Sequence, residues 1–235
     1  MTLSNLKELK NEKGFTLVEL AIVMIIIGLL IGGVLKGQEL IKNAEITSTV
    51  AQTKAVEAAV STFQDMYGGL PGDLASADTR IANCTGCDAY GDGNNSLDDD
   101  LTDWPASEGT LFFVELAAAD LVGGVANDGS GVWGDAFPEA KAGGGFIVGS
   151  SAGGAFIGGN EKPGVYLGTA LTYGDFSAGD TLTPNQAARI DRKLDDGNAE
   201  TGSVVLLVDA GACESSGVYD ETQASAQCDI AIRVR

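Results

Sequence analysis

The amino-acid sequence predicts an α+β fold. In this fold a long hydrophobic N-terminal α-helix packs by its C-terminal half on a globular head that contains an antiparallel β-sheet. Three observations lead to this prediction: residues 15–35 form an apolar run, residues 36–67 continue with helical periodicity, and residues 68–235 contain short apolar segments bounded by glycine. The high glycine content, 33 of 235 residues, agrees with a head rich in turns.

The apolar run of residues 15–35 has the length of a membrane span. Its only charged residue is Glu19. A helix that rises ~1.5 Å per residue covers ~30 Å here, which is the thickness of the hydrocarbon core of a bilayer. A secretory signal peptide would have a shorter apolar region and a small-residue cleavage site, and no such site precedes Lys36. By the positive-inside tendency, the basic segment 1–14 stays in the cytoplasm while the rest crosses.

The helix is predicted to continue through residues 36–67 as an amphipathic half. Apolar side chains recur there at intervals of three and four residues and form one stripe: Val56, Ala59, Val60, Phe63 and Tyr67. We expect this stripe to lie against the head. Gly68 and Gly69 suit a helix C-terminus and precede a turn at residues 70–73, so residue 67 is the predicted end of the helix.

The head, residues 68–235, is predicted to combine strands with two further helices. Segments rich in β-branched and apolar residues, bounded by glycine, predict strands at 145–148, 164–167 and 203–208. A helix is predicted over 183–196, with Thr183 as N-cap, Pro184 at its first position and Gly197 at its end. Another is predicted over 108–121.

The charge of the chain restricts its function. The sequence has 33 acidic and 14 basic residues, a net charge of -19, and no histidine. Binding of phosphate groups needs clustered Lys and Arg, so we expect no nucleic-acid partner. Without histidine, neither a Ser-His-Asp nor a Cys-His site can form. Acidic pairs such as Asp195-Asp196 have no companion residues that would make an active site, so the chain is predicted not to be an enzyme.

The string Lys13-Gly14-Phe15-Thr16-Leu17-Val18-Glu19-Leu20, joined to an apolar span, resembles the processing site of type IV prepilins and type II secretion pseudopilins. The resemblance covers residues 1–67. It implies that a membrane-embedded prepilin peptidase cuts between Gly14 and Phe15 and methylates the new amino terminus. Residues 1–14 would then be a cytoplasmic leader peptide. Many pilins have a proline after the span, where this chain has Lys36.

Glu19 is the candidate assembly residue. A carboxylate inside an apolar span costs several kcal/mol unless it is paired. The predicted partner is the new amino terminus at Phe15, in the same subunit or, as the resemblance suggests, in a neighbouring one. Such a pair would set the axial register of assembling helices. The alternative is that Glu19 reaches the headgroups near the start of the helix.

The four cysteines, Cys84, Cys87, Cys213 and Cys228, allow three pairings. An exported head enters an oxidising compartment, which favours disulfides over free thiols. A bond between Cys213 and Cys228 would resemble the disulfide-bounded loop near the C-terminus of many pilins, and Cys84 would then pair with Cys87. The Cys-x-x-Cys spacing also suggests redox chemistry or half a zinc site, but no histidine or second Cys-x-x-Cys completes a ligand set.

An acidic, glycine-rich stretch is a candidate calcium site, and otherwise the chain is expected to need no cofactor. Its oxygen-bearing side chains recur at alternate positions, as hard cations require. The match to an EF-hand loop is incomplete, because Leu97 stands where glycine is required and Asp103 replaces the closing glutamate. The alternative is a solvated acidic loop that keeps like-charged subunits soluble. The candidate ligands are Asp92, Asn94, Ser96, Asp98 and Asp100.

Together, these features predict a filament subunit. The chain would be inserted in the bacterial inner membrane, processed, and polymerised through its hydrophobic helix into a type IV pilus-like surface filament, or fimbrium. The expected partners are identical or related pilin subunits, the prepilin peptidase, the inner-membrane assembly machinery and the membrane itself. One alternative is a type II secretion pseudopilin in a short periplasmic fibre. Another is a membrane-anchored binding module.

Overall fold

The computed structural model describes residues 14–84, 87, 91–97, 108–125, 134, 137–151, 162–171, 181–207, 213–225 and 228–235. By its internal contacts the chain divides into two units, Met1–Asn43 and Ala44–Arg235. The division falls inside the long helix, so the C-terminal part of that helix belongs to the same unit as the head. The fold is α+β, as predicted: a long N-terminal helix and an antiparallel sheet of four strands.

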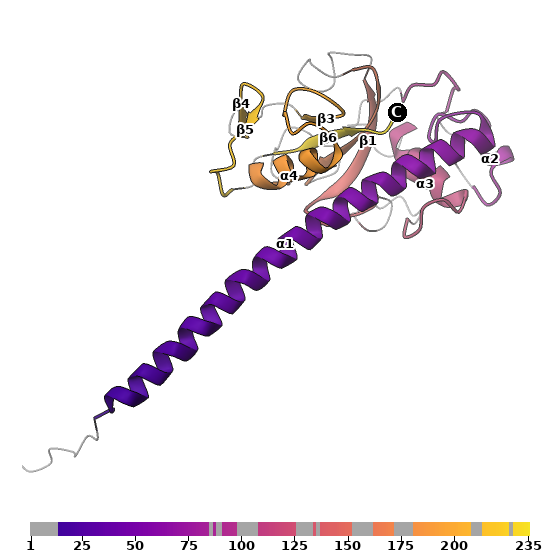
Figure 1. The fold of residues 1–235 in the computed structure, drawn as a ribbon. Helices are drawn as coiled ribbons and strands as arrows, with labels where there is room; N and C mark the ends of the chain where they lie inside the picture. Colours follow the sequence, from indigo (N-terminus) through magenta and orange to yellow (C-terminus); the bar gives the residue numbers. More distant parts are fainter. Residues whose placement is uncertain are drawn as a thin grey trace, which may run out of the picture. The chain divides into compact units, whose positions relative to one another are not determined.

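The N-terminal helix, α1, runs from Leu17 to Tyr67 and has 51 residues (Figure 1). In the first unit its apolar side chains are exposed; Leu17, for example, is 88% exposed and Leu29 78%. The most apolar window of 18 residues has a mean hydropathy of 2.7, and none of it is buried. Within the part of the chain that the structure describes, this is the one helix long and apolar enough to cross a membrane, judged by length and composition.

The part of α1 in the second unit is amphipathic, as its periodicity predicted. Val56, Ala59, Val60 and Phe63 are buried, and Tyr67 is partly buried against the same core. The rings of Phe63 and Tyr67 are 4.7 Å apart, and Phe63 belongs to a cluster that also includes Phe112 and Phe113. Nearer its start, Ile46 belongs to a second cluster of buried residues, from the fourth helix and the sheet. The stripe is therefore the surface through which the helix joins the head.

Glycine ends α1 at the predicted place. Gly68 has φ +74°, and its N–H donates to the carbonyl of Gln64 at 2.8 Å. This left-handed conformation is the one that glycine adopts without a steric cost. The following turn buries Leu70, and a short helix, α2 (Ala77–Arg80), comes after it.

The main sheet has the order β1-β2-β6-β3, and all its neighbours are antiparallel. The strands are β1 (Gly145–Ser151), β2 (Gly164–Ala170), β3 (Val204–Leu206) and β6 (Ile230–Arg233). The three predicted strands are confirmed as β1, β2 and β3. β6 was not predicted, although it occupies a central position between β2 and β3. A separate hairpin joins β4 (Glu214–Ser215) to β5 (Val218–Tyr219).

Both predicted helices of the head are present, and each ends earlier than predicted. α3 runs from Glu108 to Ala118, and α4 from Pro184 to Leu194. The start of α4 is fixed by a capping box, in which Thr183 and Gln186 each accept a hydrogen bond from the other's backbone N–H. α4 ends at Leu194, where Asp195 leaves the helical conformation (φ -150°, ψ -135°), and the N–H of Gly197 then donates at 3.1 Å to the side chain of Asp191.

Candidate functional site

The predicted processing site lies just before α1. Residues 14–16 are not helical, and Phe15 is 85% exposed. The peptide bond between Gly14 and Phe15 therefore lies outside the hydrogen-bonded helix. Residues 1–13 of the predicted leader lie outside the described residues.

Glu19 caps the start of α1. Its Oε2 accepts hydrogen bonds from the backbone N–H of Thr16 at 2.9 Å and from the Thr16 hydroxyl at 2.8 Å. Thr16 Oγ1 in turn accepts from the N–H of Glu19 at 3.2 Å. This is a capping box, which satisfies two backbone donors at a helix start. The Glu19 carboxylate is thus hydrogen-bonded to Thr16, the residue after Phe15. Cleavage between Gly14 and Phe15 would create a positive amino terminus at Phe15.

The structure contains two disulfides, Cys84–Cys87 and Cys213–Cys228. Their Cα atoms are 5.6 and 5.5 Å apart, which is normal for a disulfide, and the described residues contain no free cysteine. This is the pairing that the pilin resemblance implied. Because Cys84 and Cys87 are joined to each other and buried, they are structural here and carry no free thiol.

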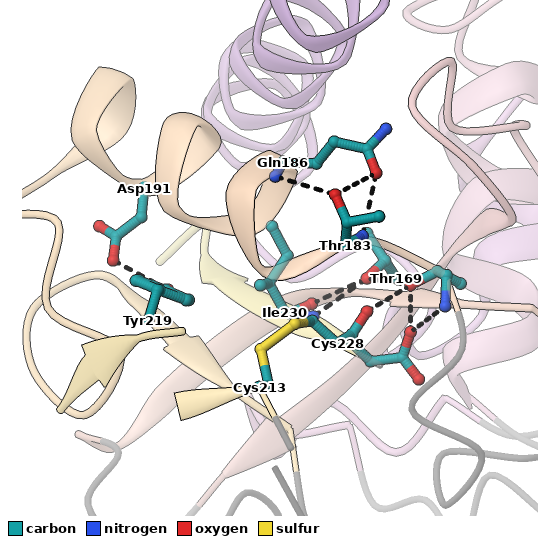
Figure 2. The surroundings of a disulfide bond; sticks show 10 residues. Thr169, Thr183, Gln186, Asp191, Cys213, Tyr219, Cys228 and Ile230 are labelled. Atoms are coloured by element: carbon teal, nitrogen blue, oxygen red, sulfur yellow. Dashed lines mark hydrogen bonds between the residues drawn. A yellow bond between two sulfur atoms is a disulfide. The ribbon is translucent and has the colours of Figure 1, made fainter. Parts of the chain in front are cut away.

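The Cys213–Cys228 bond closes the segment that contains the β4–β5 hairpin, and this segment lies on α4 (Figure 2). The Tyr219 hydroxyl donates to Asp191 Oδ2 at 3.0 Å. Arg192, next in α4, forms an ion pair with Glu221 of the same segment. Beside Cys228, the Thr181 hydroxyl donates to the Cys228 carbonyl at 2.9 Å. The disulfide therefore joins the two ends of the 213–228 segment, and a hydrogen bond and an ion pair hold this segment against α4.

Asp191 is a buried carboxyl with an unusual pKa. Burial raises its pKa to about 6, although the Tyr219 hydroxyl and the N–H of Gly197 lower it by donating to the charged form, and the neighbouring Asp196 and Asp195 raise it further. Asp191, Asp195 and Asp196 come close together at the end of α4. Asp196 accepts from the N–H of Asn198 at 2.9 Å and Asp195 accepts from the N–H of Ser203, so this acidic group shapes the 195–203 turn.

The raised pKa of Asp191 predicts an inverted pH dependence of stability. The native state takes up this proton near pH 6 and the unfolded chain only near ~4, so lowering the pH through this window stabilises the fold. We expect the Asp191 contribution to the free energy of unfolding to rise by about 1 kcal/mol from about pH 7 to about pH 5. Denaturant titrations of the full chain should show this rise and its loss in Asp191→Asn. The same pH dependence in both chains would contradict the assignment.

Three carboxyl groups from separate segments meet beside the end of α1. Asp73 follows the turn after α1, Asp92 lies in the 91–97 loop, and Glu108 begins α3. One carboxylate oxygen of each lies within 4.8 Å of the others. Asp73 and Glu108 are buried, whereas Asp92 is exposed.

The 91–97 loop wraps around Asp73. The N–H groups of Gly93 and Asn95 donate to Asp73 at 2.7 and 2.6 Å, and that of Asn94 at 3.3 Å. Burial raises the pKa of Asp73, while these N–H groups lower it. Asp92 directly precedes Gly93 in this loop, so the hydrogen bonds to Asp73 also fix the position of Asp92.

The predicted calcium ligands are only partly described. Asp98 and Asp100 lie outside the described residues. Asp92 Oδ1 accepts from the N–H of Asn94 at 2.9 Å, and Asn94 Oδ1 accepts from the N–H of Ser96 at 2.7 Å. These side chains therefore form consecutive local turns, and Asp92 is the predicted ligand that the structure brings beside other carboxylates.

Glu115 lies next to this group. It is fully buried; its Oε2 accepts from the N–H of Gly72 at 2.7 Å, and its Oε1 has no hydrogen-bond partner among the described residues. Burial raises the pKa of Glu115 to about 8, against the hydrogen bond from Gly72, and the negative charges of Asp73 and Glu108 raise it further. Sequence reasoning did not select Asp73, Glu108 or Glu115. A signal for the last two was present, because they are seven residues apart on one face of a helix.

One comparison with known proteins identifies the N-terminal part of the chain. Residues 9–35 match the family model described as the prokaryotic N-terminal methylation motif. This motif is the type IV prepilin signature, so these residues are those of a type IV pilin- or pseudopilin-like precursor. The motif is typical of structural subunits and not of enzymes, and it contains Gly14, Phe15 and Glu19. Searches of curated proteins and of solved structures find no match to the chain.

Proposed function

We propose that the chain is a structural subunit of a type IV pilus-like filament. It is made as a prepilin, cleaved between Gly14 and Phe15, N-methylated, and polymerised through the first half of α1. The observation that carries this proposal is the methylation motif at residues 9–35, which includes the first part of an apolar helix whose side chains are exposed. An apolar helix surface that is exposed in the described part of the chain needs a bilayer or other helices around it.

The first half of α1 is suited to close helix packing. Gly28, Gly32, Gly33 and Gly37 are spaced as two consecutive G-x-x-x-G pairs, and a Cβ added at any of them would meet no atom within 4 Å. Small residues at this spacing let helix backbones approach each other. Such contacts would replace lipid when subunits leave the membrane for the fibre core.

The proposed localisation and partners follow from the same helix. The precursor is anchored in the inner membrane by α1, with its leader in the cytoplasm and its head outside. The prepilin peptidase and the assembly machinery act on it there, and other pilin subunits surround α1 in the fibre. The surplus of acidic side chains makes direct nucleic-acid binding by the head unfavourable.

Intact-mass analysis and N-terminal sequencing test this proposal on native protein from two fractions, sheared surface material and washed membranes. A chain that starts at methylated Phe15 in the sheared fraction supports a surface filament subunit. The same mature chain in the membrane fraction alone favours a type II secretion pseudopilin. A chain that still starts at Met1 in both fractions would contradict processing and leave a membrane-anchored binding module.

A further inference from the structure

We propose that Asp73, Asp92 and Glu108 bind one hard divalent cation, with Ca²⁺ as the preferred ion, and that Glu115 lies directly behind this site. The ligands come from three segments that are far apart in sequence: the turn after α1, the 91–97 loop and the start of α3. This set shares only Asp92 with the loop-based calcium site that the sequence predicted.

The spacing of the carboxylates fits a calcium ion. Their ligand oxygens lie within 4.8 Å of one another, and Ca²⁺ binds oxygen at ~2.3–2.6 Å, so one ion between them can reach all three. Carboxylate oxygens are the ligands that Ca²⁺ prefers, and its coordination tolerates irregular geometry. Two N–H groups of the 91–97 loop donate to Asp73 Oδ1 and one donates to Oδ2, so a lone pair on Oδ2 remains for a cation.

Glu115 is a separate observation, beside the three carboxylates, that indicates a bound ligand. It is fully buried on α3, and its Oε1 has no hydrogen-bond partner among the described residues. Glu115 and Glu108 lie on one face of α3, and helical side chains lean toward the N-terminus, so the Glu115 carboxylate is directed toward Glu108. Its other oxygen is fixed to the N–H of Gly72, the residue before Asp73.

A buried carboxylate oxygen without a partner is costly, and here two buried carboxyl groups are close by. A divalent cation would offset the repulsion among these groups, and Glu115 would then face a positive charge. The ion would also join the end of α1 to the head, because it would hold the 70–73 turn, the 91–97 loop and α3 together.

The second acidic group, at Asp191, Asp195 and Asp196, differs from the first in that the described residues show no buried carboxylate oxygen there without a hydrogen-bond partner, whereas Glu115 beside the first group has one. Both oxygens of Asp191 accept hydrogen bonds, from Gly197 and from the Tyr219 hydroxyl. Asp196 likewise uses both oxygens, with Asn198 and the Thr201 hydroxyl. Asp196 therefore provides a matched control for the proposed site.

Calorimetric titration of the full chain in detergent, first depleted of metal with a chelator, tests the proposal with Ca²⁺ and then Mg²⁺. We expect one Ca²⁺ per chain. Asp92→Asn and Glu108→Gln should each weaken Ca²⁺ binding by about tenfold or more, because each removes a charged ligand. Asp196→Asn and Ser96→Ala should bind Ca²⁺ as the unaltered chain does. Asp92 is exposed, so its variant should fold, and formation of both disulfides, read by mass, verifies this.

Glu115→Gln supplies a second measurement. The substitution keeps the shape of the side chain but cannot carry the negative charge that a nearby cation favours, so this variant should gain less in melting temperature from added Ca²⁺ than the unaltered chain does. The proposal is overturned if the chain binds no Ca²⁺, or if Asp92→Asn and Glu108→Gln both leave binding unchanged. It is also overturned if Ser96→Ala removes binding while Glu108→Gln does not, because the site would then lie within the loop.

Discussion

A chain with Glu19→Ala is expected to be cleaved between Gly14 and Phe15 but not to form fibres. The carboxylate is the only charge in the apolar segment 15–35, and burying it in a fibre core without a partner would cost several kcal/mol. In the proposed filament, the positive amino terminus that cleavage would create at Phe15 is the partner that would remove this cost. Without the carboxylate, neither the pairing nor the register of neighbouring helices is defined. Electron microscopy of sheared material, with the N-terminus determined by mass, measures both steps.

Glu19→Gln separates the capping of α1, which the structure shows, from the charge pairing that is proposed for assembly. Glutamine also suits the third position of a capping box, so it preserves the bonds from Thr16 while removing the charge. We expect Glu19→Gln to keep the helix start and still fail to assemble. Normal fibres from Glu19→Gln would show that capping, and not charge pairing, is what assembly needs. A failure of cleavage in either variant would instead place the role of Glu19 in processing.

Much of the fold could be predicted from the sequence because its signals are local. The apolar run, the stripe from Val56 to Tyr67 and the Gly68 stop each depend on residues within a few turns of one another, and all are confirmed in α1. β6 was missed because it has only four residues, Ile230–Arg233, and lacks a glycine boundary. Its place in the sheet is determined by pairing with β2 and β3, which are distant in sequence.

The candidate cation site could also be predicted only in part, because its residues are distant from one another in the sequence. Asp92 was selected because its neighbours form an acidic, glycine-rich stretch, but the ligand pattern was expected along that one loop. In the structure its partners are Asp73 and Glu108, which only tertiary packing brings close. The capping box of Thr16 and Glu19 is different, because the Thr-x-x-Glu pattern is visible in the sequence and was overlooked beside the assembly role of Glu19.

A second large effect is expected from Gly72→Ala. Gly72 has φ +87°, and a Cβ there would overlap the carbonyl oxygen of Glu108, which is main chain and has little freedom to move. Its N–H also donates to the buried Glu115 carboxylate at 2.7 Å. The unfavourable φ and the overlap should together lower the free energy of unfolding by about 3 kcal/mol. Denaturant titration of the full chain, with its disulfides intact, measures this value.

Gly68→Ala is the matched control for that substitution. Gly68 has a similar conformation, φ +74°, but a Cβ there would meet no atom within 4 Å, so the variant isolates the cost of the left-handed backbone. We expect it to lower stability by about 1 kcal/mol. The difference between the two variants then measures how closely the turn after α1 is held against α3. Equal losses would contradict that close approach, and with it the placement of Asp73 beside Glu108.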